Sequence, residues 1–462
     1  MQTILNKLES QNLTFKLGDE QKQVLLQVFS LLNEPGYQEI GIFGSAGTGK
    51  TALTRIITKY LDFKNISYHL VAPTHKAKKI LSDTVGQDAM TIHQLLKLKP
   101  SLDILELDFN DLKFTSSTDI AIWKNGVVIL DECSMVNNDL FETLVERCKD
   151  KNTKLIVIGD AAQIAPVKQG FNSKTFKVEN AFQLKKVYRQ QDENPLLDVL
   201  LQLRKTPIFE FKEFKSNNGS LKIYNHWKQL LDDTKDLFKE SVSTSDPSKV
   251  KLFAYTNKRV EAFNKEIRKV IYDSPDEYEI GDLLTGYSAA EYQNGKKFHK
   301  IGNSYEYKVV NAKRRSKIIE HLPCEGWDLE LFDFQNQEYF SIFILSRDNS
   351  NDVFETLGVL LELQRIDAIN ASPASKNTLW KKYYKVANSF LTPKDIYVDN
   401  RLIIPKSLDY GYAMTVHKSQ SCTIDNILVD MGNIQLIKNP KELKQMQYVV
   451  LSRTKNNVYM LK

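Results

Sequence analysis

The 462-residue sequence has little of what marks several specialised classes of protein. It holds only 19 glycines and 13 prolines, which excludes collagen-like and low-complexity chains. No apolar run approaches the ~18 residues of a membrane-spanning helix, and the N-terminus lacks a basic head followed by an apolar core. We therefore expect a soluble protein that stays inside the cell and has no membrane partner.

Cysteine and arginine are also scarce. The four cysteines lack metal-ligand spacing and predict free thiols in a reducing compartment. Only 12 of the 63 basic residues are arginines, and the formal net charge is +6. That charge is compatible with a polyanionic partner but too dilute to show one. An arginine inside a motif is more informative, because guanidinium and ammonium groups are not interchangeable in bidentate phosphate contacts.

The order of apolar runs predicts an α/β chain, and its length predicts about three domains. In the first half, short apolar runs alternate with helical stretches, as in a parallel sheet buried on both faces. The four runs are Glu39–Phe43, His69–Ala72, Gly126–Leu130 and Lys154–Gly159. A second α/β stretch begins after Val187 and resumes near the C-terminus.

Two segments interrupt this rhythm. Residues 97–124 contain Pro100 and a Thr-Ser-Ser-Thr patch, which predicts a small β-rich insertion. Residues 269–405 are rich in aromatic residues and in two-residue alternation, which predicts a small antiparallel barrel. A helical patch at Asn377–Phe390 follows it.

The clearest motif is GSAGTGKT, which directly follows the first apolar run and satisfies G-x-x-x-x-G-K-[ST]. Such a loop surrounds the β-phosphate of a nucleotide such as ATP with backbone N–H groups, at the start of a helix. Lys50 would reach the β- and γ-phosphates, and Thr51 would offer a hydroxyl to Mg²⁺. The alternative, a glycine-rich turn with a stray lysine, fits the flanking strand and helix poorly. The cradle residues are Gly44, Ser45, Ala46, Gly47, Thr48 and Gly49.

Polar residues that suit phosphate chemistry end the next two runs. Asp131 would hold Mg²⁺, and Glu132 would orient and deprotonate the attacking water. Gln163 could touch both the γ-phosphate and that water. Taken alone, the two acids could be solvated caps of a strand, and the glutamine could be an ordinary surface residue. Together they predict a site at one edge of a sheet.

The ordered motifs resemble superfamily 1 helicases of the RecD-like branch, and most of all the Dda-type helicases of bacteriophages. The resemblance covers nearly the whole chain, from Leu17 to the end. Its further segments are APTHKAKKIL, TIHQLL, VYRQ, YAMTVHKSQS and YVVLSRTK, in that order. The sequence departs from the family pattern at Ser421, where the family usually has glycine, which puts the local loop shape in doubt.

The resemblance implies two RecA-like P-loop NTPase domains, with a small pin insertion in the first and an SH3-like β-barrel insertion in the second. The implied domains are residues 1–96 and 125–186 for the first, 97–124 for the pin, 187–268 and 406–462 for the second, and 269–405 for the SH3-like insertion with its helical extension.

For the nucleotide, the resemblance implies that Gln21 reads the adenine edge and that Arg189 and Arg453 reach the γ-phosphate across a cleft. Arginine fingers of this kind stabilise the charge of the transition state. The alternatives are a solvent-facing glutamine and surface ion pairs.

The resemblance also implies two grips on single-stranded DNA. Either histidine of the first grip could instead be a structural, hydrogen-bonded residue. Phe109 or Phe114 could stack at the fork as a wedge, although a core position is as plausible for each. The grip residues are Pro73, Thr74, His75, Lys76, Thr91 and His93 in the first domain and Thr256, Asn257, Thr415, His417 and Lys418 in the second.

Together these features predict a monomeric, ATP- and Mg²⁺-dependent DNA helicase that moves 5′ to 3′ along single-stranded DNA and acts at forks. Its cell would be a bacterium or a phage-infected host, in the cytoplasm, with replication or recombination proteins as possible partners. Two alternatives remain open: a translocase that strips proteins or acts on RNA with weak unwinding, and a nucleotide-gated loading protein.

Overall fold

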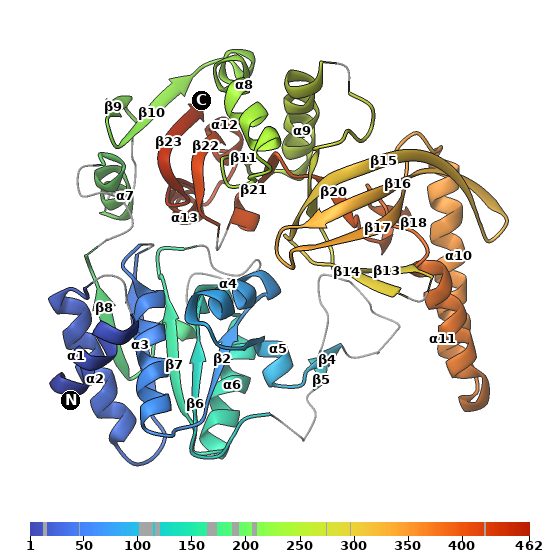
Figure 1. Cartoon of the computed structure of the whole chain (residues 1–462). Coiled ribbons are helices and arrows are strands. Elements are labelled where there is room, and N and C mark those ends of the chain that lie inside the picture. Colours follow the sequence, from blue (N-terminus) through green and yellow to red (C-terminus); the bar gives the residue numbers. More distant parts are fainter. Residues whose placement is uncertain are drawn as a thin grey trace.

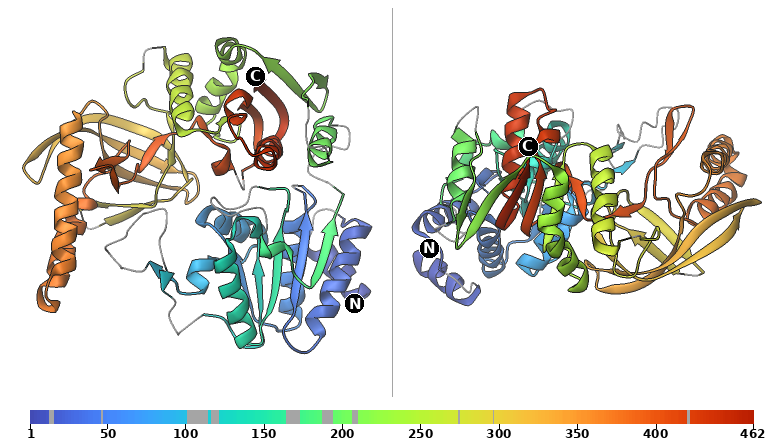
Figure 2. Two further views of the ribbon diagram at one scale, coloured as in Figure 1. Left: turned by 180° about the vertical axis from the view of Figure 1, so that it is seen from behind. Right: turned by 90° about the horizontal axis from the view of Figure 1, so that it is seen from above.

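The computed structural model contains two lobes and a third body beside the second lobe (Figure 1). It describes residues 1–12, 16–45, 47–100, 114–115, 121–163, 173–186, 194–205, 210–273, 275–295, 297–419 and 422–462. Within those ranges, no helix is long and apolar enough to cross a membrane. The two views of Figure 2 place the third body to one side of both lobes.

The first lobe is built on a six-stranded, fully parallel sheet in the order β3-β2-β6-β7-β1-β8. The four predicted apolar runs are confirmed as strands, and they are the four central neighbours of this sheet. The strands are β1 (Glu39–Gly44), β2 (Tyr68–Ala72), β3 (Ala89–Thr91), β6 (Val127–Leu130), β7 (Lys154–Gly159) and β8 (Asn180–Leu184).

Helices cover both faces of this sheet, which explains why its strands are apolar throughout. In β7, Ile156 and Ile158 belong to the core under α1 to α4, whereas Leu155 and Val157 belong to the core under α5 and α6. The helices are α1 (Gln2–Asn12), α2 (Asp19–Asn33), α3 (Lys50–Phe63), α4 (His75–Val85), α5 (Ile92–Leu95) and α6 (Asn138–Asp150), with 3₁₀ turns at Cys133–Met135 and Lys174–Phe176.

The second lobe repeats the parallel sheet in the order β21-β11-β22-β23-β10-β9, with β9 alone antiparallel. The predicted strand-then-helix unit is confirmed as β11 and α9. The strands are β9 (Phe214–Ser216), β10 (Gly219–Tyr224), β11 (Val250–Ala254), β21 (Ala413–Thr415), β22 (Ile424–Asp430) and β23 (Thr454–Leu461). The helices are α7 (Leu196–Lys205), α8 (Trp227–Ser243), α9 (Asn257–Tyr272), α12 (Met431–Ile434) and α13 (Pro440–Leu451), with a 3₁₀ turn at Val416–Ser419.

The third body is an antiparallel sheet in the order β17-β16-β15-β12-β20. Its antiparallel pairing agrees with the two-residue alternation, and the small barrel stays a prediction. One continuous apolar core joins it to α8 and α9 of the second lobe. β20 belongs to this sheet because it pairs with β12, although the predicted boundary at residue 406 assigns it to the second lobe. The strands are β12 (Leu283–Gly286), β15 (Glu306–Ile319), β16 (Leu322–Asp333), β17 (Glu338–Leu345) and β20 (Leu408–Tyr410).

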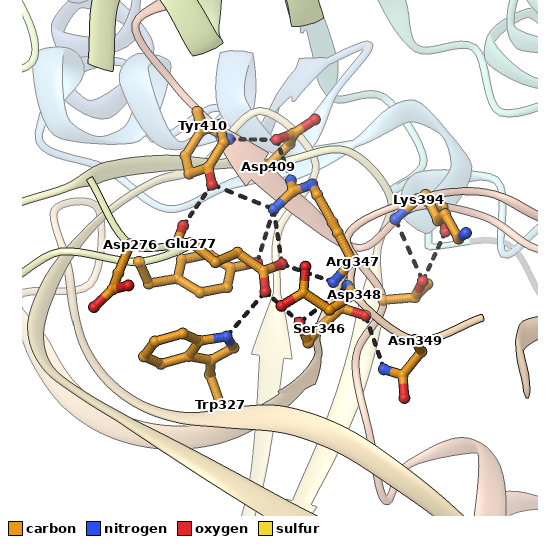
Figure 3. A network of polar contacts seen from close by, with 12 residues as sticks. Asp276, Glu277, Trp327, Ser346, Arg347, Asp348, Asn349, Lys394, Asp409 and Tyr410 are labelled. Atoms are coloured by element: carbon orange, nitrogen blue, oxygen red, sulfur yellow. Dashed lines mark hydrogen bonds and ion pairs between the residues drawn. The ribbon is translucent and has the colours of Figure 1, made fainter. Parts of the chain in front are cut away.

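The edge strands β17 and β20 do not pair with each other among the described residues. Side chains connect them instead (Figure 3): Arg347, just after β17, contacts Asp409 of β20 at 2.6 Å and Glu277 at 3.2 Å. Glu277 also accepts a hydrogen bond of 2.9 Å from the Trp327 indole. Charged side chains therefore hold the two open edges near each other at one end of the sheet.

Smaller elements complete the third body and the predicted pin. The predicted helical patch is confirmed as α11, and the long helix before it, α10, was not predicted. In the 97–124 segment, the backbone of Pro100 pairs with that of Phe114, and Phe109 lies outside the described residues. The elements are β4 (Lys99–Pro100), β5 (Phe114–Thr115), the hairpins β13 (Ala290–Asn294)–β14 (Lys297–Ile301) and β18 (Ile396–Val398)–β19 (Arg401–Ile404), α10 (Asn351–Asn370) and α11 (Pro373–Ala387).

Candidate functional site

The GSAGTGKT loop connects the end of β1 to the first residue of α3. Gly47 and Gly49 have φ values of +83° and +81°, in the left-handed region that glycine adopts most easily. A Cβ atom on Gly49 would lie 2.4 Å from Nε2 of Gln21, so a larger residue there would displace Gln21 as well as strain the backbone. The helix start thus presents backbone N–H groups that lack partners within the helix, as an anion site requires. Ala46 lies outside the described residues.

Three side chains support this loop. Lys50 donates from Nζ to the carbonyl oxygens of Gly44 and Ser45, both at 2.9 Å, and therefore lies across the loop. Buried Gln21 donates to the Thr48 carbonyl at 2.9 Å, while its own oxygen accepts from the Gly18 N–H at 2.9 Å. Gln21 therefore connects the start of α2 to the phosphate loop. It is buried, so the alternative of a solvent-facing glutamine does not apply.

Two acidic residues follow β6, on the strand next to β7. Asp131 continues the sheet, since its N–H donates to the Val71 carbonyl, and its carboxylate accepts from the Glu132 N–H at 2.8 Å. Burial, and secondly the Glu132 carboxylate, raises the pKa of Asp131 to about 7, while Lys50 acts in the opposite direction. Lys50 is thus close enough to Asp131 to affect its charge, and a cation at this site would favour the ionised carboxylate.

Glu132 has a strained backbone and an unsatisfied carboxylate. Its φ of +51° lies in the left-handed region, which costs about 1 kcal/mol for a residue with a side chain. Its Oε2 atom is buried and has no hydrogen-bond partner in the described part of the chain. Strain and an unpaired buried oxygen at the end of a strand fit a group that acts on a ligand.

Gln163 and Arg453 each also have a buried polar atom without a hydrogen-bond partner among the described residues. Gln163 is buried in the turn after β7, and its Oε1 atom lacks a partner among the described residues. Arg453 follows α13 in the second lobe, and its Nε donates to the Val449 carbonyl at 3.0 Å. Its buried Nη2 atom has no described partner. Unpaired buried polar atoms are rare. The Arg453 Nη2 donor is suited to a ligand oxygen atom, and the Gln163 Oε1 acceptor is suited to a hydrogen-bond donor such as a water molecule. Arg189 lies outside the described residues.

The donors available for a metal ion are few. No group of three or more His, Cys, Asp or Glu side chains able to hold a metal occurs among the described residues. Thr51, in the first turn of α3, and Asp131 are the candidate ligands. This set fits Mg²⁺, which is usually bound by one or two carboxylates together with substrate phosphates and water.

The first predicted grip is at the start of α4 and α5. The Thr74 hydroxyl caps α4 by accepting from the Ala77 N–H at 3.1 Å, and buried Thr91 caps α5. Burial lowers the pKa values of His75 and His93, and the two imidazoles lie close enough for His75 to lower the pKa of His93 further. Both are therefore neutral hydrogen-bonding groups near pH 7. Thr91 has a structural role in the helix start.

Lys76, in the same grip, connects the lobes. Its Nζ donates to the Sγ atom of Cys422 at 3.1 Å. Although burial lowers its pKa, Cys422 and Glu306 outweigh that effect and the pKa is raised overall. Lys76 is therefore a charged group at the junction of α4 with the second lobe and the third body.

The second predicted grip is at the ends of β11 and β21. Thr256 caps α9 by accepting from the Arg259 N–H at 3.3 Å, and Thr415 is buried at the end of β21. Asn257 is exposed at the start of α9. Burial lowers the pKa of His417. Burial, and then the nearby Lys406 and Lys76, lowers the pKa of Lys418 to about 7.

The comparisons with known proteins agree with this arrangement. Residues 16–224 match the family described as AAA domain. Over 96% of its length the chain is 26% identical to "ATP-dependent DNA helicase dda" of Enterobacteria phage T4, of which it covers 98%. Over 91% of its length it is 23% identical to "ATP-dependent DNA helicase Pif1" of Campylobacter jejuni, of which it covers 87%. Over nearly its whole length the chain is therefore similar to Dda- and Pif1-like helicases of superfamily 1.

The fold of a solved helicase of this group is also similar. The crystal structure of Pif1 helicase from Candida albicans has a TM-score of 0.51, with 17% identity over 97% of this chain and 95% of that one. This likeness confirms the mixed α/β fold with parallel sheets, and the curated relatives confirm the predicted resemblance to superfamily 1 helicases.

The structure adds residues to this helicase site that no motif indicated. Tyr287 lies between two ammonium groups, with Nζ of Lys418 at 3.5 Å and Nζ of Lys406 at 4.0 Å from the ring centre. Asn433 accepts from the N–H groups of Tyr255 and Thr256, at 2.8 and 2.9 Å. No signal in the sequence beyond their residue types could have found them, because Tyr287 lies in a loop and Asn433 in the short helix α12, both outside the quoted motifs.

Proposed function

We propose that the chain is an ATP-dependent DNA helicase that couples hydrolysis to movement of its two lobes. The observation that supports this best is the division of the site. The phosphate loop, the two acids and Gln163 belong to the first lobe, whereas Arg453 belongs to the second. A γ-phosphate oxygen bound by both sets of groups would connect the lobes, so its release would let them move apart.

The roles in hydrolysis follow from the chemistry of each residue. The loop N–H groups and Lys50 hold the phosphates. Gln21 fixes the loop, and the family resemblance implies that it also reads the adenine edge. Bound Mg²⁺, held by Thr51 and Asp131, would neutralise charge on the phosphates. Glu132 accepts the proton of a water that attacks the γ-phosphorus in line, and the bond to the β-phosphate oxygen breaks. Gln163 orients that water, and Arg453 with Arg189 stabilises the transferred phosphoryl group.

The substrate side of the proposal rests on the two grips. Threonine hydroxyls at helix starts, neutral imidazoles and ammonium groups are donors that suit the backbone of a single strand. Alternating use of the two grips during each ATP cycle would move the protein along DNA, and the family resemblance implies the 5′-to-3′ direction. We assign strand separation to a pin at 97–124, supported by an SH3-like insertion at 269–405, in a monomer that binds fork DNA.

A Lys50→Ala variant tests the ATP site. We expect DNA-stimulated phosphate release to fall at least about 100-fold, because a preorganised positive donor at the phosphates is lost. Circular dichroism should show an intact fold. Lys59→Ala is the matched control, since it removes a half-buried lysine of the same helix, whose ion pair in the described part of the chain is with Asp62. Normal hydrolysis by Lys50→Ala would contradict the assignment.

Unwinding assays separate the helicase from its alternatives. Partial duplexes with a 5′ or a 3′ tail, each made of DNA and of RNA, are incubated with ATP and the protein. Unwinding of the 5′-tailed DNA alone is expected. Hydrolysis without unwinding would favour a translocase, preference for RNA tails an RNA helicase, and absence of DNA-stimulated hydrolysis a loading protein.

A further inference from the structure

We propose that the hydrogen bond between Tyr448 and Asp160 is a positioning contact that sets Gln163 and Arg453 in register at the same γ-phosphate. The proposal rests on the proposed function, because it assigns a role within the same hydrolysis site. The Tyr448 hydroxyl donates to Oδ2 of Asp160 at 2.8 Å. The two residues are 288 positions apart, one in each lobe, and both are fully buried.

The first-lobe end of this contact determines the shape of the turn that carries Gln163. Asp160 follows β7 directly. Its Oδ1 accepts from the Ala162 N–H at 3.0 Å, and its backbone carbonyl accepts from the Gln163 N–H at 3.1 Å. One carboxylate therefore binds the second lobe with one oxygen and holds the Gln163 turn with the other.

The second-lobe end holds the segment that carries Arg453. Tyr448 lies in the last turn of α13, where its carbonyl accepts from the Ser452 N–H at 3.0 Å. The Arg453 N–H donates to the Val450 carbonyl at 3.2 Å, and its guanidinium donates to Val449. Arg453 is thus fixed to the same helix end as Tyr448. A displacement of the Tyr448 hydroxyl relative to Asp160 would move Arg453 relative to Gln163.

The residues packed around the Tyr448–Asp160 hydrogen bond are mainly apolar on the second-lobe side, so the hydrogen bond supplies the directional contact. Ala162 of the first lobe packs against the apolar core of the second lobe. Beside it lies a cavity of about 290 Å³, lined by Ala161, Ala162, Leu203, Lys441, Gln445 and Tyr448. Apolar packing has no preferred direction, so it does not by itself fix how the two lobes are aligned. A charge-assisted hydrogen bond is directional and roughly twice as strong as a neutral one, so it can fix the register that packing leaves open.

Neither residue needs to touch the reacting atoms in this proposal. The polar atoms left unpaired for a ligand belong to Gln163 and Arg453, whereas the polar atoms of Asp160 and Tyr448 are engaged with each other. Loss of the contact should therefore reduce the rate of hydrolysis in the bound complex and leave the binding of ATP nearly unchanged, since the phosphate loop belongs wholly to the first lobe.

The test compares Tyr448→Phe, Asp160→Asn and the double variant with a matched control, Tyr412→Phe. Tyr412 donates to Asp282 at 2.8 Å, and both are buried, but neither belongs to the first lobe. The kcat and KM of DNA-stimulated ATP hydrolysis and the thermal midpoint are measured for each. We expect Tyr448→Phe and Asp160→Asn each to lower kcat about tenfold with KM within about twofold, because a small misplacement of catalytic groups is enough for such a loss.

The double variant should be no slower than either single variant, since both remove one interaction. Tyr412→Phe should lower the thermal midpoint in a similar way and leave kcat within about twofold. An unchanged kcat in Tyr448→Phe, an equal fall in Tyr412→Phe, or additive losses in the double variant would overturn the inference. A wild-type protein without DNA-stimulated hydrolysis would instead overturn the proposed function, and the inference with it.

Discussion

The two lobes have similar strand-to-helix turns, here called corners, but different residues hydrogen-bond to the backbone of each. In the first lobe, Ala72-Pro-Thr-His-Lys76 follows β2, and in the second, Ala254-Tyr-Thr-Asn-Lys258 follows β11. In each, the central threonine caps the next helix. Proline has no N–H at the first corner, whereas the Tyr255 N–H at the second needs an acceptor and finds it in Asn433.

The lysines of the two corners differ as well. Lys76 is engaged with Cys422 at the junction between the lobes, whereas Lys258 is exposed. The same short sequence pattern therefore makes different distant contacts in the two lobes: through the lysine side chain at the first corner, and through two backbone N–H groups at the second. Equivalent positions in a loose duplication need not have equivalent roles.

The largest expected effect comes from removing Asn433, the side chain that accepts hydrogen bonds from the backbone of the second corner. Asn433→Ala leaves two backbone N–H groups without their acceptor, so the free energy of unfolding should fall by about 2 kcal/mol. Urea denaturation measures it, and DNA affinity should weaken at the same time. Asn433→Asp keeps an acceptor oxygen and is the control. Equal stability of Asn433→Ala and wild type would remove the difference between the corners.

The next effect is a pH dependence of DNA affinity that we expect from the second grip and not from the first. Lys418, with its pKa near 7, is half-charged in the free protein at neutral pH, and a DNA phosphate would favour the charged form. Binding then takes up a proton above pH 7, so affinity should fall by up to about tenfold per pH unit between pH 7 and 8.5.

The first grip should not contribute to this slope, because the lowered pKa values of His75 and His93 leave them neutral throughout that range. Fluorescence anisotropy with a labelled single strand measures the affinity. Lys418→Arg, which stays charged, should flatten the profile, whereas Lys258→Arg should not. An unchanged slope in Lys418→Arg would show that another group takes up the proton.

The smallest effect concerns the two caps. Thr74→Ala and Thr256→Ala each remove a side-chain acceptor at a helix start, and each should lower the free energy of unfolding by about 1 kcal/mol. The serine variants keep the hydroxyl and should recover most of that loss. A much larger loss at one corner than at the other would show that its threonine also has a role beyond capping.

Local patterns predicted much of the fold. The central strands of the first sheet are apolar on both faces, so their runs stood out, and so did the alternation in β15, β16 and β17. Helix α10 was not predicted, because apolar residues occur around most of its surface and no single stripe marks it. The predicted boundary at residue 406 leaves β20 with the second lobe, since only its pairing with β12, more than 120 residues earlier, reveals its place in the third body.

The features of the candidate site also fall into two groups: those that local sequence predicts and those that depend on contacts between distant segments. The phosphate loop and the acids after β6 depend on local geometry, so the sequence alone indicated their chemistry. The bracing role of Gln21, the junction contact of Lys76 and the pair formed by Tyr448 and Asp160 depend on approaches between distant segments. A single sequence shows which residues could form such contacts, but not which of them meet.

The position of β23 has a consequence for biosynthesis. This last strand lies inside the second sheet, between β22 and β10, whereas every strand of the first sheet precedes residue 185. At about 5–20 residues per second, a ribosome needs roughly 10 to 40 s to proceed from β11 to β23. During that interval β10 lacks its neighbour β23, and the neighbours of β11, which are β21 and β22, are made only near its end. The nascent second lobe would therefore expose sheet edges that a chaperone could recognise, while the first lobe can already be folded.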